Sequence, residues 1–311
     1  SENRIGELCQ NEALPSYFET IAERLSALQT SDGTESDNGV TRPLVIAGGT
    51  DLYVQRGEEI PDQSVELLNT GEAVGPAIEK EGRIIVHARM SFQDFGDDPL
   101  IRAAIPEIAA YNELIASWPI RTRASLGGNI CNASPIGDMT CLLLAMNSGL
   151  SLAGGSESRC LALKDFFLGY KQLAKTDEEV IETVSFSKPD SNTLVNWEKV
   201  SKRPVLDIAT VNSAVRFETD GHLIKEGHLA LGGVAAIPLY LVETSKYLSN
   251  QVVTSEFVFS LVDIALSEFE PISDIRGSAG YKRLLARQLI LAHFLKLFPD
   301  VISEEVIYAA L

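Results

Sequence analysis

Apolar residues recur at helical spacing near both ends of the chain and in its middle. Four of them within residues 15–29 fall on one face and predict a first helix: Phe18, Ile21, Leu25 and Leu28. Residues 99–118 also have helical spacing, with a break at Pro106 because proline disrupts a helix. Further helices are predicted over residues 139–146, 238–248, 255–268, 279–297 and 303–310.

Short apolar runs of β-type composition lie between these helices. The run 43–47 is followed directly by glycines and then by residues 52–56, an order that predicts a strand, a tight turn and then a helix or turn. A hairpin is predicted around Gly154-Gly155, and Asp220-Gly221 predicts a second hairpin turn. The other predicted strands are 84–88, 150–153, 160–163, 180–186, 193–199, 209–218 and 223–232.

Two breaks in these patterns suggest the domain organisation. Residues 30–41 are polar and rich in Gly, Ser and Asp, which is typical of a surface loop. A second boundary is predicted near residues 188–193. The length of 311 residues exceeds the roughly 100–200 residues of a usual domain. We therefore expect an N-terminal helix and connector at 1–35, one domain at 36–190 and another at 191–311.

Charge excludes several classes of partner. The chain has 26 Lys and Arg residues against 43 Asp and Glu residues, a net charge of −17. Such a charge repels phosphate backbones and anionic lipid surfaces, so we expect neither nucleic acid nor a membrane as a partner. The first residues lack the basic start and apolar run of a signal peptide, which predicts a cytoplasmic protein.

Metal-binding patterns are absent from the sequence. The four cysteines are too widely spaced for a zinc or iron–sulfur ligand set, and the four histidines form no HExxH pair. We expect no metal site on this chain. The residues concerned are Cys9, Cys131, Cys141, Cys160, His87, His222, His228 and His293.

Two glycine-rich turns, residues 47–51 and 127–129, are candidates for anion binding. Missing side chains let successive backbone N–H groups converge on a phosphate. A single Gly-Gly pair is more often a simple tight turn, but two such pairs in one chain favour anion binding. Neither turn is a Walker loop, and neither reads GxGxxG. A P-loop ATPase and a nicotinamide-binding Rossmann fold are therefore disfavoured.

Residues 121–138 match neither a helix nor a strand pattern. Within them Asn129 and Ser134 can donate to phosphate or flavin oxygens, and Asp138 can accept from ribose hydroxyls. The alternative is a loop that satisfies its own polar groups, with Asp138 as the N-cap of the helix that follows. The two readings are compatible with each other.

Together these motifs carry a family resemblance. The run AGGTD, followed by LGGNICNASPIGD, resembles the two FAD-binding motifs of the flavoprotein subunit or domain of molybdenum hydroxylases. The runs SPIGD, DFFLGYK and KVSKR are most similar to the xanthine dehydrogenase branch rather than to the related carbon monoxide dehydrogenase branch. The further matching runs are DFFLGYK, KVSKRPVLDIATVNSAV, LGGVA and SDIRGSAGYKR.

The resemblance implies an α+β fold. A two-subdomain FAD-binding domain of the PCMH type, like that of vanillyl-alcohol oxidase, would precede a smaller α+β domain like the C-terminal domain of carbon monoxide dehydrogenase flavoproteins. The segment before residue 30 resembles the connector that follows an iron–sulfur domain, so the chain is expected to be part of a longer polypeptide.

The resemblance also implies an FAD site. Residues that would wrap the pyrophosphate are Val45, Ile46, Ala47, Gly48, Gly49, Thr50, Asp51 and Leu52. Residues of the second wall would be Ser125, Leu126, Gly127, Gly128, Asn129 and Ser134, with Asp138 anchoring the polar chain of the cofactor. Ile181 would lie against the flavin ring and Lys199 near its N1/C2=O edge, where a cation stabilises the negative charge of the reduced ring. The alternative for Lys199 is a surface lysine beside Glu198.

The resemblance implies that the chain is the component from which electrons pass to the final acceptor. Molybdopterin and 2Fe–2S clusters would lie on partner subunits or domains, and FAD would pass their electrons to NAD or another acceptor. The run Pro204-Val205-Leu206 is less polar than the nicotinamide-binding region of such dehydrogenases, which leaves the acceptor open. No catalytic side chain is expected, and the partner interface should be an apolar patch. The alternatives are a stand-alone FAD-dependent oxidoreductase acting on a small molecule and a non-catalytic assembly domain.

Overall fold

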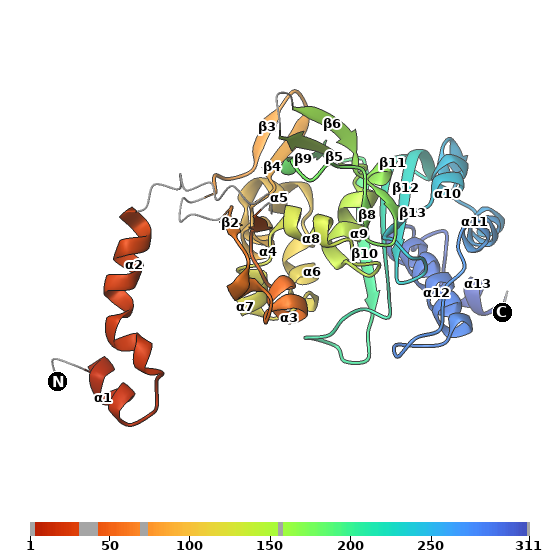
Figure 1. The fold of residues 1–311 in the computed structure, drawn as a ribbon. Helices are drawn as coiled ribbons and strands as arrows, with labels where there is room; N and C mark the ends of the chain where they lie inside the picture. The colour runs from red at the N-terminus through yellow and green to blue at the C-terminus, as the bar shows by residue number, and fades with distance from the viewer. Residues whose placement is uncertain (1–3, 31–42, 69–73, 155–157, 310–311) are drawn as a thin grey trace. The chain divides into compact units, whose positions relative to one another are not determined.

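The computed structural model describes residues 4–30, 43–68, 74–154 and 158–309, which form two compact units (Figure 1). The units comprise residues 1–43 and 44–311. In the first unit, helix α1 (Arg4–Gln10) precedes a 3-10 turn, η1 (Ser16–Thr20), and helix α2 (Ile21–Thr30). The helix predicted over 15–29 is thus confirmed from Ile21, after a first 3-10 turn. Most of the predicted loop 30–41 lies outside the described residues.

The second unit begins with a small parallel pair of strands. Strand β1 (Leu44–Ile46) pairs with β2 (Val65–Leu67). Between them, the glycine turn leads into helix α3 (Leu52–Arg56) and the 3-10 turn η2 (Ile60–Asp62). The predicted order of strand, turn and helix is confirmed.

A five-stranded antiparallel sheet follows, in the order β3-β4-β9-β5-β6. Strands β5 and β6 form the hairpin predicted around residues 154 and 155. The strands are β3 (Ile78–Lys80), β4 (Arg83–His87), β9 (Val180–Ser187), β5 (Gly149–Ala153) and β6 (Arg159–Ala162). Between β6 and β9 lie η3 (Leu163–Asp165) and the short pair β7 (Phe167–Gly169) and β8 (Gln172–Leu173).

Six helices connect β4 to β5: α4 (Phe92–Asp97), α5 (Pro99–Ala104), α6 (Ile108–Leu114), α7 (Trp118–Arg121), α8 (Leu126–Asn132) and α9 (Asp138–Ala145). The break predicted at Pro106 lies between α5 and α6. The prediction that 121–138 is neither helix nor strand is wrong, because α8 occupies its centre. Glycine and asparagine have low helix propensity, and the two glycines and two asparagines of α8 obscure it in the sequence. Leu126 and Ile130, spaced i and i+4, are nevertheless buried on its inner face.

The C-terminal part is a second antiparallel sheet with helices. Its strands are β10 (Thr193–Val200), β11 (Val211–Asp220), β12 (Leu223–Gly232), β13 (Leu239–Tyr240) and β14 (Gln251–Val252). Its helices are α10 (Val242–Leu248), α11 (Ser255–Ser267), α12 (Ala279–Leu297) and α13 (Glu304–Ala309). The predicted hairpin turn at Asp220-Gly221 is confirmed. The helix predicted from 238 begins only at Val242, because β13 precedes it.

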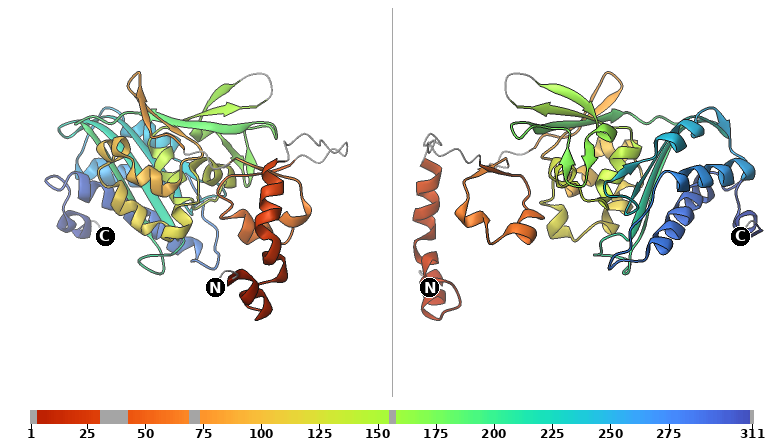
Figure 2. Two further views of the ribbon diagram at one scale, coloured as in Figure 1. Left: turned by 90° about the vertical axis from the view of Figure 1, so that its left-hand side faces the viewer. Right: turned by 45° about the vertical axis from the view of Figure 1, so that its right-hand side comes forward.

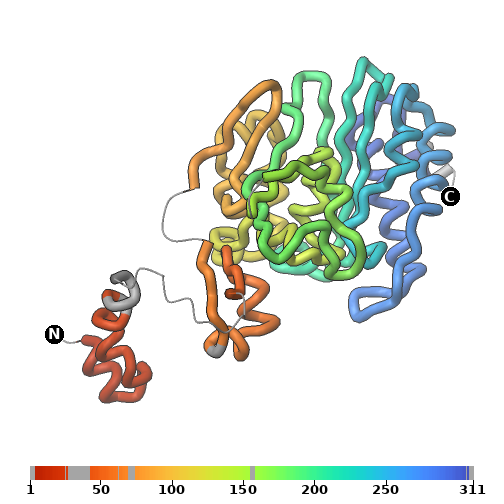
Figure 3. Tube along the Cα trace, turned by 45° about the horizontal axis from the view of Figure 1, so that its top comes forward, coloured from red at the N-terminus to blue at the C-terminus, as the bar shows by residue number. Residues whose placement is uncertain are grey.

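This second sheet lies between two hydrophobic cores, one on each face. Ala214 and Ala230 point to the core that contains α9, whereas Val215, Phe217 and Leu229 belong to the core that contains α12. The alternation follows from the period of two along a strand, and it explains why β11 is buried on both faces. Figures 2 and 3 show the teal strands between the yellow-green helices and the blue helices. Among the described helices, none is both long and apolar enough to cross a membrane.

One buried histidine links this sheet to α12. His293 is 0% exposed, and Asn196 Nδ2 donates to its Nδ1 at 2.8 Å. The ring proton therefore sits on Nε2, which faces Ser213 Oγ at 2.8 Å. Burial, together with the nearby charge of Lys296, lowers the pKa of His293 from 6.5 to about 3. A neutral imidazole is thus part of the folded state.

This burial predicts a pH-dependent stability. Between its ordinary pKa of 6.5 and its folded pKa of about 3, the unfolded state binds a proton that the folded state does not. The free energy of unfolding should therefore fall as pH decreases through this window, by about 1.4 kcal/mol per pH unit from His293. Urea denaturation at pH 7 and 5 measures it. His293→Gln should reduce this slope.

Candidate functional site

The first glycine turn connects β1 to α3 and leaves backbone donors free. Gly49 has a φ of +70°, a left-handed conformation that glycine adopts without strain. The backbone N–H groups of Gly48, Gly49 and Thr50 form no hydrogen bond with another described residue, and all three residues are half-buried. Adjacent N–H groups of this kind make a concave site for an anion. The turn therefore fits the phosphate-binding role implied by the resemblance.

The remaining residues predicted around this turn have structural partners. Val45 and Ile46 lie in β1 opposite Glu66 and Leu67, and Ile46 is buried. Asp51 precedes α3, and its Oδ2 accepts from Gln55 Nε2 at 2.6 Å. Ala47 and Leu52 bracket the turn and are half-buried.

The second glycine pair has a different role, because its N–H groups are already bonded. Leu126 N donates to Met90 O at 3.1 Å and Gly127 N to Ala88 O at 2.8 Å. Gly128 N donates to Ser125 Oγ at 3.2 Å, so Ser125 caps α8. A Cβ at Gly127 would lie 2.9 Å from Ala88 Cβ. At Gly127 the missing side chain allows α8 to pack closely on Ala88. Of the two glycine turns, the first alone has backbone N–H groups without an acceptor among the described residues.

The structure nevertheless brings the two turns together. A Cβ at Gly48 would lie 1.8 Å from the carbonyl oxygen of Arg123 and 3.2 Å from Ala124 Cα. These two residues directly precede Ser125 and the second glycine pair. Because Gly48 has no side chain, the backbone carrying the free donors can pack against the start of α8.

Two further predicted residues retain free side-chain donors. Asn129 Oδ1 accepts from Thr140 Oγ1 at 2.8 Å, which leaves its Nδ2 without an acceptor among the described residues. The hydroxyl of Ser134 likewise has no partner in the described part of the chain. Lys171 Nζ bonds to the backbone carbonyl and the side chain of Asn132, which fastens the end of α8. Both candidate donors therefore lie on an anchored segment.

Asp138 and Lys199 form a buried ion pair. Lys199 Nζ lies 2.7 Å from Asp138 Oδ2, and the two side chains are 3% and 11% exposed, respectively. The ammonium also donates to the carbonyl oxygens of Leu114 and Asp207, both at 2.8 Å, so all three of its hydrogens are used. The reading of Lys199 as a surface lysine is therefore wrong. Asp138 is not the N-cap of α9 either, because that position is Gly137.

Asn212 completes this cluster. Its Nδ2 donates to the second oxygen of Asp138 at 2.6 Å, while its own Oδ1 is buried without a hydrogen-bond donor. Burial raises the pKa of Asp138 above its ordinary value, and the ammonium of Lys199 and the amide of Asn212 oppose the rise. The cation stabilises the carboxylate at the start of α9, and the carboxylate holds the cation in place.

Ile181 lies apart from these polar groups. It is 6% exposed in β9, pairs with Leu152 and belongs to the core beneath the first sheet. Helix α8, which carries the second glycine pair, packs against β9, the strand that contains Ile181.

Sequence reasoning missed Asn212 and Gly233 as site residues. Gly233, with a φ of +87°, donates from its N–H to Pro135 O at 2.8 Å and so ties the segment between α8 and α9 to the second sheet. Both residues lie in runs that carry the family resemblance. The Gly232-Gly233 pair was a signal for close backbone approach, whereas nothing in the sequence marks Asn212 as the partner of Asp138.

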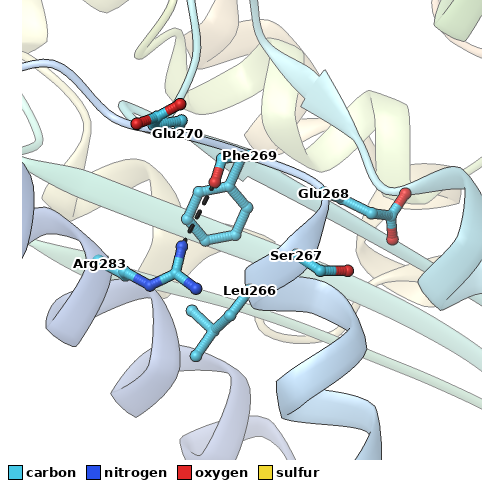
Figure 4. A pocket seen from close by; sticks show the side chains of 6 residues that line it. All are labelled: Leu266, Ser267, Glu268, Phe269, Glu270 and Arg283. Atoms are coloured by element: carbon cyan, nitrogen blue, oxygen red, sulfur yellow. Dashed lines mark hydrogen bonds between the residues drawn. The ribbon is translucent and has the colours of Figure 1, made fainter.

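Two cavities border the described surface. One, of about 190 Å³, adjoins the ion pair and is lined by Leu114, Lys199, Val200, Ser201, Arg203 and Pro204. The other, of about 470 Å³, lies at the end of α11 and contains none of the predicted site residues. In Figure 4 its Arg283 reaches the carbonyl oxygen of Phe269, at 3.4 Å. Of these two cavities, the smaller one shares a residue, Lys199, with the candidate site.

Comparison with known families covers nearly the whole second unit. Residues 19–189 match the family described as "FAD binding domain in molybdopterin dehydrogenase". Residues 198–297 match "CO dehydrogenase flavoprotein C-terminal domain".

Individual relatives agree with these matches. The carbon monoxide dehydrogenase medium chain of Afipia carboxidovorans is 30% identical over 249 residues, 79% of this chain and 84% of the relative. The xanthine dehydrogenase FAD-binding subunit of Escherichia coli O157:H7 is 22% identical over 241 residues, 76% and 82% of the two chains. A solved carbon monoxide dehydrogenase from Hydrogenophaga pseudoflava, which lacks the Mo-pyranopterin moiety, superposes with a TM-score of 0.73 at 26% identity, covering 79% and 86%. These likenesses confirm the predicted fold class.

The buried ion pair predicts a strong energetic coupling. Lys199→Met leaves the Asp138 carboxylate without its cation, and Asp138→Asn leaves the ammonium without its carboxylate. Each should lower the free energy of unfolding by about 3–5 kcal/mol, because an uncompensated charge remains buried. The double variant should lose at least about 1 kcal/mol less than the sum of the two single losses.

A double-mutant cycle in urea measures this coupling. The matched control is Lys188 with Glu79, also 2.7 Å apart but with side chains 41% and 43% exposed. Its coupling should stay within about 1 kcal/mol. Equal coupling energies for the two pairs would contradict a special role for the buried one.

Proposed function

The chain belongs to the family of FAD-binding domains of molybdopterin dehydrogenases, and from this premise we propose that it is the electron-transfer component of a xanthine dehydrogenase-like molybdenum hydroxylase. In this role it works with an iron–sulfur component and a molybdopterin component on other subunits or domains. FAD held by this chain would supply the redox chemistry that connects these clusters to NAD or another acceptor. The present chain contributes the residues that hold and tune this cofactor.

The observation that carries the proposal is the first glycine turn. Gly48, Gly49 and Thr50 offer three half-buried N–H groups that have no acceptor among the described residues. A pyrophosphate provides the negative oxygens that such donors need, and the unpartnered groups of Asn129 and Ser134 can extend the contact. The site thus fits a dinucleotide with a phosphate-rich centre.

The ion pair supports the redox role. Lys199 is a buried cation beside a cavity, and its position is set by one carboxylate and two carbonyl oxygens. Because the carboxylate of Asp138 compensates the ammonium, the pair is a fixed dipole whose positive end, Lys199, borders the cavity. Such a dipole stabilises an anion at that end without reorienting during electron transfer. No described side chain has to supply or remove a proton for this role.

The glycine turn predicts a selective loss of FAD. Gly49→Val places a side chain 2.7 Å from the Tyr53 ring at a φ of +70° and displaces the free donors. Gly82→Val has the same backbone strain, at a φ of +72°, but nothing lies within 4 Å of its Cβ. Flavin absorbance per purified chain should fall at least tenfold for the first variant and stay near wild type for the second. Stoichiometric flavin in both variants would remove the first turn from the site.

Anaerobic stopped-flow mixing with NADH tests the acceptor. Rapid bleaching of the FAD-loaded chain identifies NAD as the acceptor and a nicotinamide site complete on this chain. A flavin that dithionite reduces but NADH does not would assign another acceptor, or a nicotinamide site that partner subunits complete.

A further inference from the structure

A row of three residues crosses the second sheet beside the candidate site. In the register of β10, β11 and β12, Lys199 lies opposite Asn212, and Asn212 lies opposite Gly232 (Figure 1). Directly paired residues of neighbouring strands lie on the same face of a sheet. The row is therefore on the face that packs against α9, whose first residue is Asp138.

Each oxygen of the Asp138 carboxylate has its own donor from this row. Lys199 Nζ lies 2.7 Å from Oδ2, and Asn212 Nδ2 donates to Oδ1 at 2.6 Å. The Asn212 NH2 group also donates to Ile136 O at 3.3 Å. Because this group faces two oxygen atoms, the reversed amide would set its own oxygen against both of them. The orientation of the Asn212 amide is therefore determined by its acceptors.

This orientation leaves one buried atom without a partner. Asn212 is 0% exposed, and its Oδ1 has no hydrogen-bond donor among the described residues. The oxygen lies so close to Gly232 that a Cβ at that position would be only 2.2 Å away. Burying an unpaired amide oxygen is unfavourable, and an apolar side chain would avoid it. The short hydrogen bond to Asp138 is the interaction that Asn212 gains in return.

We propose that Asn212 is a positioning residue of the cofactor site: it keeps Asp138 an anion aimed at Lys199, and through this pair it sets how strongly the site favours reduced over oxidised FAD. This inference rests on the proposed function. With Asp138 ionised, the pair is a dipole whose positive end borders the cavity of about 190 Å³. With Asp138 protonated, Lys199 would be an uncompensated cation, which stabilises a nearby anion more strongly.

Asp138 is the group whose protonation Asn212 controls. Burial raises the pKa of Asp138, and the charge of Lys199 and the hydrogen bonds from Lys199 and Asn212 oppose the rise. Without the Asn212 amide the carboxylate loses a donor, so the pKa of Asp138 should rise further. The other titratable group facing Asp138 in the described part of the chain is Cys141, also on α9. Burial raises the pKa of the Cys141 thiol well above its ordinary value, so this thiol stays neutral.

Urea denaturation of the FAD-free full chain over a range of pH tests this control without the cofactor. As pH falls between the pKa of Asp138 in the wild type and its higher pKa in Asn212→Ala, the folded variant takes up a proton that the folded wild type does not. The variant should therefore regain stability relative to the wild type. Its unfolding constant, divided by that of the wild type, should fall at least tenfold between pH 8 and the lowest pH at which both are folded.

Asn112→Ala is the matched control. Asn112 is 4% exposed, its Nδ2 donates to Phe92 O at 2.7 Å, and its Oδ1 is likewise buried without a partner among the described residues. Because a backbone carbonyl does not titrate, the ratio for this variant should change less than twofold over the same pH range. Asn212→Ala should also lose its pH dependence in an Asp138→Asn background. A pH-independent loss of stability in Asn212→Ala itself would overturn the proposal.

The midpoint potential of the bound flavin, titrated with dithionite at the same pH values, tests the consequence for the cofactor. Where Asp138 is protonated in Asn212→Ala alone, the preference for reduced over oxidised FAD should exceed that of the wild type at least tenfold. This corresponds to a potential about 30 mV higher for a two-electron couple. Asn112→Ala should match the wild type at every pH. Equal potentials in Asn212→Ala and the wild type would contradict the proposal, whatever the stability measurements show.

A second pair of variants keeps both amides and displaces them instead. Gly232→Ala places a methyl group 2.2 Å from Asn212 Oδ1, and Gly96→Ala places one 1.9 Å from Asn112 Nδ2. Gly232→Ala should reproduce both effects of Asn212→Ala, and Gly96→Ala should reproduce neither. This pair answers the same question if Asn212→Ala does not fold.

FAD content separates this inference from the proposed function. A wild-type chain that binds no FAD would contradict the proposed function. A wild-type chain that binds FAD, with the same potential as Asn212→Ala and Gly232→Ala at every pH, would contradict only the role of Asn212.

Discussion

The buried contact between Asp138 and Lys199 is the interaction on which the site depends. Asp138 is the first residue of α9, and Lys199 lies near the end of β10, so their 2.7 Å contact joins the helical layer of the FAD-binding domain to the C-terminal sheet. Each charge would be costly alone in this environment. Leu114, Asp207 and Asn212 satisfy the remaining hydrogen-bonding groups, which makes the pair a fixed element of the fold.

Glycine has two physical roles in the two motifs, although the sequences look alike. At Gly49 it permits a left-handed turn whose N–H groups remain available to a ligand. At Gly127 it permits α8 to approach Ala88, and its own N–H is bonded to the chain. The first use builds a binding surface and the second positions it. Gly48 joins the two by allowing one backbone to lie on the other.

The longer strands and most of the longer helices could be predicted because apolar spacing survives in them, whereas β2, β3, β7, β8, β13 and β14, with two or three residues each, are too short to show such a pattern. The hairpin at Asp220-Gly221 and the buried helix α9 are examples. Helix α8 could not be recognised, since its glycines and asparagines serve tertiary contacts and capping that outweigh weak helix propensity. Helical spacing alone also predicted that α10 starts at residue 238. In the structure, residues 239 and 240 pair with β12 as the short strand β13, so the helix begins later.

By itself, the sequence determined the fold class, the family and the two segments that carry the glycine turns, because local periodicity and short motifs involve residues close together in the sequence. Only the tertiary structure decided which donors remain free, that Lys199 is buried against Asp138, and that Asn212 and Gly233 belong with them. Those features arise between residues far apart in sequence. Hydrogen-bond satisfaction is a property of the packed chain, and no local pattern encodes it.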